Sequence, residues 1–488
     1  MNMHRQLLSL LVIFCAGVTA WSAAPKNDAG PSETKPAPAT VRLNAKEKKI
    51  ELTSQAITLQ DWNLGLEANG QRIDSAMAEM EILREQPPHF RLSFPKLGIL
   101  WTVRAEADVA GATLLYSTLE NKSSKPIKLG KVSPMETGPV RIGQSDESVV
   151  FLPESGSQGP SRLGRIADPN SDRSSQIKFQ FYNRAERVAF HVGFVTFTHA
   201  NPQLQFKYSD PAGMHGLNAF CDFGGWQLQP GQSTPVETLY VAVGSDPYAQ
   251  LERWADLAVA AAPVRPRVWD DPPIGWVGFT FVDQFFVERY EDVVLRNAAA
   301  IQRRLKGFGV HYIWVSIGNM EGGIPGDWLS WNRCAFPSGH EYLIERLRQL
   351  DIKLGFWVAP FWVNGAFSGG QNGLQDATLK GRDGSPLIAY EHLMWGQAST
   401  MPVEKRPNAY TLDPTNPKAL GYIRDTFATL RQWGIRYYMI DFLGAGAGMN
   451  NAQHDPTAVP GVEAYCKMLA AVREGAGDDT YLLASSGP

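Results

Sequence analysis

The second half of the chain alternates short, almost wholly apolar runs with longer amphipathic segments. Runs such as KLGFWVAP (353–360) and IRYYMID (435–441) are typical of strands, and NPKALGYIRDTFATLRQW (416–433) has the period of a helix. Strands that lack polar alternation are buried on both faces, as in parallel sheets covered by helices. We therefore expect a parallel sheet in which strands and helices alternate.

Two architectures contain such a sheet, the closed TIM-type (β/α) barrel and the doubly wound fold. The first run, IGWVGFTFVDQ (274–284), lacks the G-x-G-x-x-G turn that binds dinucleotides in the doubly wound fold. The barrel is therefore favoured for residues 263–488. About five strand and helix units fit this range, whereas a full barrel has eight units and roughly 250 residues. We expect an incomplete barrel, and thus a chain that is a piece of a longer protein.

Residues 41–262 have a different pattern. Runs such as ILWTVRAEADV (99–109) and RVAFHVGFVTF (187–197) alternate with period two and are separated by turn residues. This spacing predicts an all-β sandwich. We expect it to support the barrel domain, with carbohydrate binding as an alternative role. A helix is predicted at 248–262, and Pro263, Pro266, Pro272 and Pro273 mark the domain boundary.

The N-terminus has the pattern of a secretory signal peptide. Arg5 precedes the apolar run LLSLLVIFCAGV (7–18), which is too short to cross roughly 30 Å of hydrocarbon, and small residues follow it. We assign 1–24 to the signal peptide and the Pro-rich 25–40 to a linker. A lipid anchor on Cys15 is the alternative, and the bulky Phe14 argues against it. The protein is expected to be exported to the periplasm or the outside, without a membrane partner.

Charge and cysteine content exclude several further classes of function. The formal net charge of the 488 residues is −3, so no basic excess is present to bind nucleic acid. The mature chain keeps Cys221, Cys334 and Cys466, an odd number without the spacing of a zinc site. We expect no disulfide framework, no metal ion and no cofactor.

Polar residues at strand C-termini are the candidate site, because those ends converge in a (β/α) barrel. Asp441 directly follows the fourth strand, where an unused carboxylate is costly to bury. A helix cap or a salt bridge is the structural alternative for Asp441. The loop after the second strand places Asp327, Trp328 and Trp331 near the same rim. Trp357 and Trp362 of the third strand would add aromatic faces for a sugar ring, although a Trp taken alone is more often a core residue than part of a sugar site.

The motifs in this half resemble those of a known family. GDW (326–328), FPSG (336–339), KLGFWVAP, LDPTNP (412–417), GIRYYMIDF (434–442) and SSG (485–487) occur in the order found in melibiase-type α-galactosidases of glycoside hydrolase families 36 and 27. The resemblance covers about Gly275 to the C-terminus and implies a β-sandwich before a (β/α) barrel. It also implies a retaining glycosidase whose nucleophile is Asp441.

The same resemblance implies which residues bind the substrate, a carbohydrate with α-linked galactose or a related sugar. These residues are Asp327, Trp328, Trp357, Ser316, Ser485 and Ser486. Two positions depart from the family pattern. Ser316-Ile317 replaces a paired Asp-Asp that holds galactose hydroxyls, and Met439 replaces a Lys two residues before the nucleophile. We therefore expect a divergent member with a changed pocket, because a site that lacks its polar partners discriminates less.

The general acid of the family lies beyond the SSG segment, and so beyond the end of this chain. Glu288, Glu291, Glu391 and Glu404 are alternatives, and none occupies the family position. Three functions stay open: an exported retaining glycoside hydrolase, a non-catalytic sugar-binding protein of the same fold, and a transglycosidase. The sequence does not determine the oligomeric state.

Overall fold

The computed structural model describes residues 39–108, 111–154, 162–168, 173–210, 212–263, 269, 272–278, 289–316, 318–320, 325–364, 373–392, 402–449 and 451–485. The predicted signal peptide, 1–24, and residues 25–38 of the predicted linker lie outside these ranges. Within them, no helix has both the length and the apolar character needed to span a bilayer.

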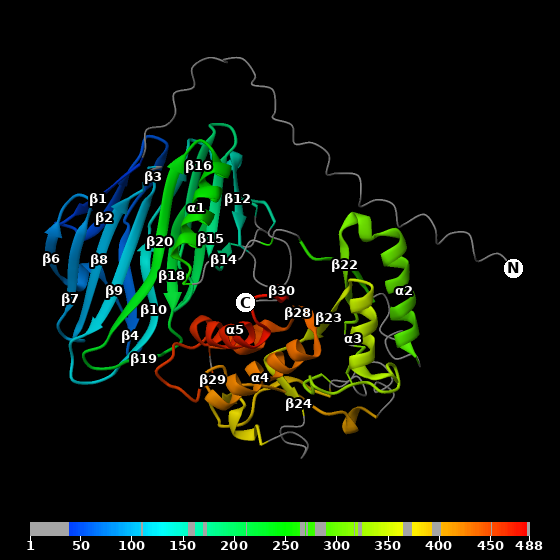
Figure 1. The fold of residues 1–488 in the computed structure, drawn as a ribbon. Coiled ribbons are helices and arrows are strands. Elements are labelled where there is room, and N and C mark those ends of the chain that lie inside the picture. The colour runs from blue at the N-terminus through cyan, green and yellow to red at the C-terminus, as the bar shows by residue number, and fades with distance from the viewer. Residues whose placement is uncertain are drawn as a thin grey trace, which may run out of the picture. The chain divides into compact units, whose positions relative to one another are not determined.

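The first half is built from antiparallel strands (Figure 1, blue to green). The larger sheet has nine strands, in the spatial order β13 (Gly164–Arg165), β12 (Val149–Pro153), β15 (Lys178–Asn183), β16 (Val188–Phe194), β20 (Ser233–Gly244), β9 (Thr113–Asn121), β8 (Ile99–Ala107), β7 (His89–Phe94) and β6 (Glu79–Arg84). A second sheet has the order β14 (Ser174–Ser175), β17 (Asn201–Ser209), β18 (Gly213–Asp222), β10 (Ile127–Glu136), β4 (Asn63–Ala68) and β5 (Gln71–Asp74), with β19 (Gln227–Leu228) paired to β10. Two short pairs complete this half: β1 (Thr40–Asn44) with β2 (Lys49–Thr53), and β3 (Ile57–Leu59) with β11 (Val140–Ile142).

The two large sheets share one hydrophobic core. Phe206 of β17 packs edge-on against Phe151 of β12 and Phe179 of β15, with ring centroids 5.0 and 5.4 Å apart. In β8, every second side chain from Ile99 to Ala105 is buried, as the period of a strand requires. The period-two runs of the sequence are thus strands whose apolar faces meet in this core.

The helix predicted at 248–262 is α1 (Pro247–Ala261). Asp246 caps its N-terminus by accepting hydrogen bonds from the backbone N–H groups of Tyr248 and Ala249. The Trp254 indole donates a hydrogen bond to the Phe194 carbonyl at 2.9 Å. This bond links α1 to β16 of the nine-stranded sheet.

The second half contains a parallel sheet whose spatial order is the chain order. Its strands are β21 (Ile274–Val277), β22 (Val310–Trp314), β23 (Lys353–Val358), β28 (Ile435–Ile440) and β30 (Tyr481–Ala484). Each neighbouring pair is parallel. A doubly wound sheet reverses its strand order at a switch point, and these five described strands show no reversal. The predicted parallel sheet is confirmed, and it curls like part of a barrel.

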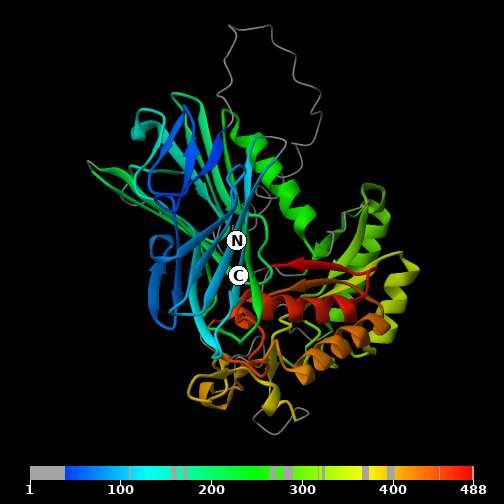
Figure 2. The ribbon, with the colours of Figure 1, turned by 90° about the vertical axis from the view of Figure 1, so that its left-hand side faces the viewer.

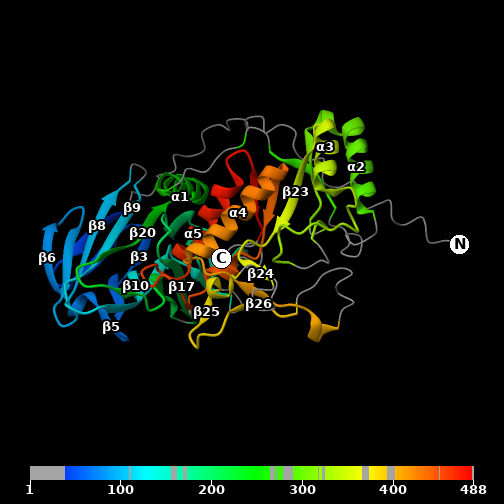
Figure 3. The ribbon, with the colours of Figure 1, turned by 60° about the horizontal axis from the view of Figure 1, so that its bottom comes forward.

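Four helices connect these strands: α2 (Tyr290–Arg304), α3 (Gly339–Gln349), α4 (Pro417–Trp433) and α5 (Val462–Ala476). Helices that follow one another in the chain also contact one another. Figure 2 shows α4 in orange beside α5 in red, and Figure 3 shows α2 beside α3. In α4, the buried Ala419, Ile423, Phe427 and Leu430 recur at helical spacing and pack into the core of this half.

Short strands and short 3₁₀-helices occupy the connections after β23. β24 (Trp362–Asn364), β27 (Ala409–Thr411) and β26 (Ile388–Tyr390) form one antiparallel sheet, and β25 (Lys380–Gly381) pairs with β29 (Asn451–Ala452). The β25–β29 pair joins the loop after β23 to the loop after β28, so both loops lie at the C-terminal edge of the parallel sheet.

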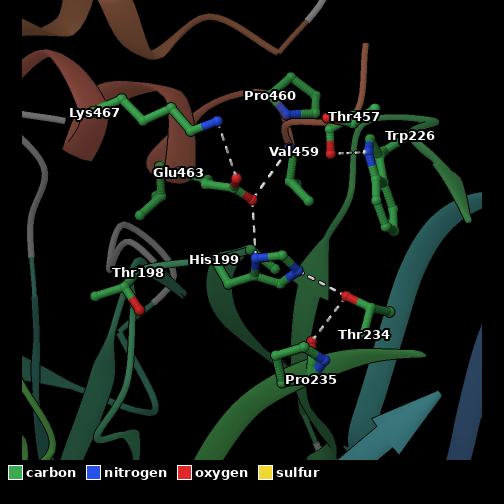
Figure 4. Close-up of polar contacts among 12 residues, drawn as sticks. Thr198, His199, Trp226, Thr234, Pro235, Thr457, Val459, Pro460, Glu463 and Lys467 are labelled. Atoms are coloured by element: carbon green, nitrogen blue, oxygen red, sulfur yellow. Dashed lines mark hydrogen bonds and ion pairs between the residues drawn. The ribbon is translucent and has the colours of Figure 1, made fainter. Parts of the chain in front are cut away.

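Polar contacts link the loop before α5 to the antiparallel strands (Figure 4). The His199 imidazole Nδ1 lies 2.9 Å from Glu463 Oε2, and its Nε2 lies 2.7 Å from the Thr234 hydroxyl. The Trp226 indole donates to the Thr457 carbonyl at 3.0 Å. Burial alone would raise the pKa of Glu463, but the hydrogen bonds from His199 and the Val459 N–H outweigh it, so this pKa is lowered.

Candidate active site

Asp441 directly follows β28 at the C-terminal edge of the parallel sheet. Its backbone N–H donates to the Val358 carbonyl of β23 at 3.0 Å. Its Oδ1 accepts a hydrogen bond from the Phe442 N–H at 2.8 Å, and its Oδ2 accepts one from the Trp357 indole at 3.1 Å. The two bonds fix the plane of the carboxylate at the edge where (β/α) barrels have their active sites.

The ends of four neighbouring strands meet beside this carboxylate. The Trp357 N–H donates to the Ser316 carbonyl at 3.2 Å, and the Ser485 N–H donates to the Ile440 carbonyl at 2.9 Å. Four residues are therefore consecutive along one sheet edge: Ser316, Trp357, Asp441 and Ser485. In the chain, 169 positions (485 − 316) separate the first of them from the last. Ser486 lies outside the described residues.

Three tryptophans form a packed cluster next to Asp441. The Trp357 ring lies 5.7 Å from Trp328 and 6.4 Å from Trp362 between centroids, and the Trp328 indole donates to the Trp362 carbonyl at 3.1 Å. All three side chains are buried, at 3, 4 and 2% exposure for Trp328, Trp357 and Trp362. They pack against one another and against the strand ends, and little of their ring surface is exposed.

Two aromatic side chains that the sequence analysis did not single out are exposed beside this cluster. Phe442 stacks on Trp362 with a centroid distance of 4.5 Å and is 38% exposed. Tyr390 lies 6.3 Å from Trp362 and is 51% exposed. One indication of Phe442 was present in the sequence, because this residue directly follows Asp441. Tyr390 had none, because only tertiary packing brings β26 to the cluster.

Trp331 does not lie at the rim beside Asp441, where the sequence predicted it. Its ring packs against Phe336 and Phe356, with centroids 5.1 and 6.0 Å away, and edge-on against Trp433 of α4. Phe356 precedes Trp357 in β23, and successive side chains of a strand point to opposite faces. Trp331 is therefore a core residue on the helix side of the sheet.

The backbone of the GDW motif packs closely against β24. Gly326 has a φ of +101°, and a Cβ there would lie 2.4 Å from the Asn364 N atom, so only glycine fits against β24. This approach places the half-buried Asp327 between Gly326 and the clustered Trp328. Burial, together with the charge of Asp327, raises the pKa of Tyr422, whose hydroxyl donates to the Gly326 carbonyl at 3.4 Å.

Ser316 has an unusual backbone conformation for its residue type. It is fully buried with a φ of +54°, in the left-handed region that L-residues other than Asn and Asp seldom adopt. Its hydroxyl, like the buried Asn319 Oδ1, has no hydrogen-bond partner among the described residues. Phe442 is also left-handed, at +52°. Such strain costs about 1–3 kcal/mol per residue and is concentrated at functional sites.

The LDPTNP motif fixes the loop that follows Asp441. The buried Asp413 accepts hydrogen bonds from the Thr415 N–H at 2.8 Å and hydroxyl at 2.7 Å, and from the His454 N–H at 2.6 Å. Asn416 caps α4 by accepting from the Lys418 N–H at 2.9 Å. The motif is thus structural: it begins a helix and anchors the backbone of His454 and Asp455.

Met439, the residue in place of the family Lys, lies in register with Trp357 of the neighbouring strand. Because β-strand side chains alternate, both point to the same face of the sheet. A half-buried thioether therefore borders Trp357 where the resemblance would place a cation.

The four glutamates considered as general acids have different surroundings. Glu291 is buried and accepts a hydrogen bond from the Ser338 N–H at 3.1 Å, a structural role at the start of α2. Glu404 is exposed, and Glu288 lies outside the described residues. Glu391 is exposed and adjacent to Tyr390, so it is the nearest of the four in the chain to the aromatic cluster.

Cys221, Cys334 and Cys466 are free thiols, and no described group of His, Cys, Asp and Glu side chains has a geometry for holding a metal ion.

Comparison with known proteins bears on the fold. No family model matches the chain. An α-galactosidase from Thermus thermophilus in complex with p-nitrophenyl α-D-galactopyranoside has a TM-score of 0.52 at 19% identity, over 82% of this chain and 71% of that chain. A variant of a family 36 α-galactosidase from Geobacillus stearothermophilus in complex with stachyose has a TM-score of 0.56 at 14% identity, over 91% of this chain and 61% of that chain.

A third similar structure is the galactosidase domain of an α-galactosidase-sucrose kinase. Its TM-score is 0.56 at 12% identity, over 91% of this chain and 59% of that chain. The chain thus spans about three fifths of the length of two of these three structures. These likenesses confirm that the chain shares the fold of the family 36 α-galactosidases, the resemblance that its motifs predicted.

Proposed function

We propose that this chain contains the nucleophile-bearing part of a retaining glycoside hydrolase that acts on α-linked galactosides or related sugars. The observation that carries the proposal is the Asp441 carboxylate, held by Trp357 and the Phe442 N–H at the C-terminal edge of the parallel sheet. Crystal structures of the same fold contain p-nitrophenyl α-D-galactopyranoside and stachyose, which supports an α-galactoside as the substrate.

The proposed reaction has two displacements at the anomeric carbon. In the first, an Asp441 oxygen bonds to this carbon while the glycosidic C–O bond breaks, and a second carboxylic acid protonates the departing oxygen. In the second, water attacks the same carbon, the ester bond to Asp441 breaks, and the second carboxylate takes a proton from the water. Two inversions leave the configuration of the sugar unchanged.

The substrate preference is expected to differ from that of a standard α-galactosidase. Ser316 presents a short hydroxyl where the resemblance implies a carboxylate pair, and Met439 presents a thioether where it implies a cation. A site that lacks charged partners for sugar hydroxyls rejects wrong sugars less strongly. We propose that Ser485, Asp327 and the exposed ring of Phe442 contact the sugar, with the buried Ser316, Trp328 and Trp357 positioning them.

A panel of p-nitrophenyl α- and β-glycosides and raffinose-type oligosaccharides tests the proposal. Hydrolysis of α-galactosides by the wild type, with retention seen by NMR of the first-formed anomer, is the expected result. Asp441→Asn is expected to lower kcat by at least about three orders of magnitude, because it removes the nucleophile. Wild-type activity in Asp441→Asn, or inversion of the anomer, would contradict the mechanism.

A non-catalytic sugar-binding protein is the second candidate function. Ser316 and Met439 favour it, since both replace groups that the resemblance assigns to the sugar. Binding of galactosides by calorimetry together with no hydrolysis across the whole panel would establish this function in place of the first. A transglycosidase would instead release longer oligosaccharides at high acceptor concentration.

Three further properties belong to the same proposal. Residues 41–262 would act as a β-sandwich that supports the catalytic domain, and the parallel sheet would be part of a closed barrel. Residues 1–24 would be a signal peptide that directs export. N-terminal sequencing of the mature protein tests the last point, and an N-terminus before residue 20 in exported material would contradict it.

A further inference from the structure

A polar hollow lies on the seven-stranded antiparallel sheet, apart from the Asp441 edge. It measures about 620 Å³, within the range of roughly 300–1,000 Å³ that is usual for small-molecule sites. Twelve residues line it, among them Arg72, Glu136, Arg173, Ser174, Lys207 and Asn218. Most of these are polar side chains, contributed by five strands and the residues next to them.

Strand register places part of this lining in one straight row. Ser174 of β14 pairs with Gln205 of β17, Gln205 pairs with Asn218 of β18, and Asn218 pairs with Glu136 of β10. Paired residues in neighbouring strands point to the same face. The neighbours of Gln205, Leu204 and Phe206, are buried in the core, so this row lies on the face away from the core. Side chains that can both donate and accept hydrogen bonds therefore lie next to one another on β14, β17 and β18, and the Glu136 carboxylate follows them on β10.

Several polar atoms of this hollow have no hydrogen-bond partner in the described part of the chain. Glu136 Oε1, Arg173 Nε and Asn218 Oδ1 are buried, and none makes a hydrogen bond with a described residue. An unpaired buried polar group costs about 1–3 kcal/mol, and native structures contain few of them. Three such atoms around one hollow indicate a surface that is completed by a ligand with many hydrogen-bonding groups.

The hollow is also positively charged. Its lining contains three cationic side chains, Arg72, Arg173 and Lys207, and one carboxylate, Glu136. Glu136 forms an ion pair with Arg72. Neither Arg173 nor Lys207 has a carboxylate partner among the described residues; Arg173 instead donates to the Tyr208 carbonyl at 2.8 Å. The whole chain has a formal charge of −3, so this excess is local. Two unneutralised cations favour an anionic ligand.

We propose that this hollow binds an acidic oligosaccharide, one whose sugar residues carry carboxylates. The row of Ser174, Gln205 and Asn218 provides hydrogen bonds for sugar hydroxyls, and Lys207 and Arg173 bind the carboxylates. The site is distinct from the Asp441 edge and does not depend on hydrolysis there. It would hold the enzyme on an acidic glycan while a different chain enters the catalytic site.

Calorimetry on the full chain carrying Asp441→Asn tests this, because the variant removes the proposed nucleophile and leaves the hollow intact. The ligands are tetragalacturonate, a neutral mannotetraose of the same length, and sodium sulfate as a free anion. Tetragalacturonate is expected to bind, with affinity that falls as NaCl rises from 50 to 300 mM. Lys207→Gln should weaken binding about tenfold, the effect of losing one charge-assisted hydrogen bond.

The matched control is Lys96→Gln, which removes an exposed lysine from the turn between β7 and β8 of the other sheet. It should bind like the parent, and both variants should melt like the parent because both lysines are exposed. Equal binding of mannotetraose, equal binding of sulfate, or equal weakening by Lys96→Gln would overturn the proposal, as would no binding of tetragalacturonate. None of these results bears on hydrolysis at Asp441.

Discussion

The indole Nε1 of Trp357 donates a hydrogen bond to Asp441 Oδ2 across 3.1 Å. The two residues are in neighbouring parallel strands, and 84 positions separate them in the chain. Trp357 is itself held by Trp328 and Trp362, so the indole N–H has one orientation available. The carboxylate proposed as the nucleophile is thereby positioned by a packed aromatic cluster.

Trp357→Phe is expected to lower kcat by about 10–100-fold, because a hydrogen bond to a charged group contributes about 1.5–3 kcal/mol. KM should change little if Trp357 orients Asp441 and does not itself bind the sugar. Steady-state kinetics on p-nitrophenyl α-galactoside measures both constants. Trp362→Phe is the control, since Trp362 belongs to the same cluster, and its smaller loss of kcat would separate the hydrogen bond from the packing. Equal losses in both variants would show that the cluster acts through packing alone.

The pair of His199 and Glu463 predicts a pH-dependent contribution to stability. The pKa of Glu463 is lowered in the folded protein, so its contribution is fully present above the ordinary Glu value of 4.5 and is lost as the pH falls through the lowered value. Glu463→Gln should reduce Tm by about 2–4 °C at pH 7, equivalent to about 1 kcal/mol, and this difference should shrink as the pH falls through the lowered pKa of Glu463.

Melting curves of wild type and Glu463→Gln between pH 7 and pH 3 measure this difference. Glu474→Gln, on the exposed side of the same helix, is the matched control and should change Tm little at any pH. A difference for Glu463→Gln that stays constant down to pH 3 would rule out the ionised Glu463 carboxylate as its origin.

His191 predicts acid sensitivity in the antiparallel half. Burial, aided by the charge of Lys178, lowers its pKa to about 3, and its Nδ1 lies 2.8 Å from Gln180 Oε1. Between the ordinary value of 6.5 and about 3, the unfolded chain binds a proton that the folded chain does not. The free energy of unfolding should therefore fall with decreasing pH, by on the order of 1.4 kcal/mol per unit from this group.

Urea unfolding at pH 7, 6, 5 and 4 reports this slope. His191→Asn should be less stable at pH 7, because it loses packing against Tyr240 and Trp254, but its stability should decline less with acid. His215→Asn changes an exposed histidine of β18 and should keep the wild-type slope. The same slope in His191→Asn as in the wild type would refute a neutral buried imidazole.

Gly475 predicts a stability effect at the contact of α4 with α5. A Cβ at Gly475 would lie 2.2 Å from the Arg424 carbonyl oxygen and 2.9 Å from Phe427 Cβ. Gly475→Ala should therefore lower the free energy of unfolding by about 1–3 kcal/mol, the usual cost of overpacking. In Gly421→Ala, the new Cβ meets only the Arg424 side chain, at 3.8 Å. Gly421→Ala should be neutral or stabilising by up to about 1 kcal/mol, as in an open helix interior. Chemical denaturation compares the two, and equal effects would contradict close helix packing.

The local pattern of the sequence is sufficient to predict the elements of the second half. Near-continuous apolar runs become the five parallel strands, and the helical period of 416–433 becomes α4, which begins at Pro417 because Asn416 caps it. It also placed Asp441 at the end of a strand. These are local properties, set by side-chain period, capping and turn chemistry within a few residues.

Which side chains share a face depends on long-range packing. Trp331 and Trp357 carry the same side chain and were predicted at one rim, yet Trp331 packs under the helices and Trp357 contacts Asp441. The row from Gln205 to Glu136 and the pair of His199 with Glu463 likewise come from segments far apart in the chain. Strand register and helix docking bring such residues together, and both depend on the burial of whole faces, which no short stretch of sequence encodes.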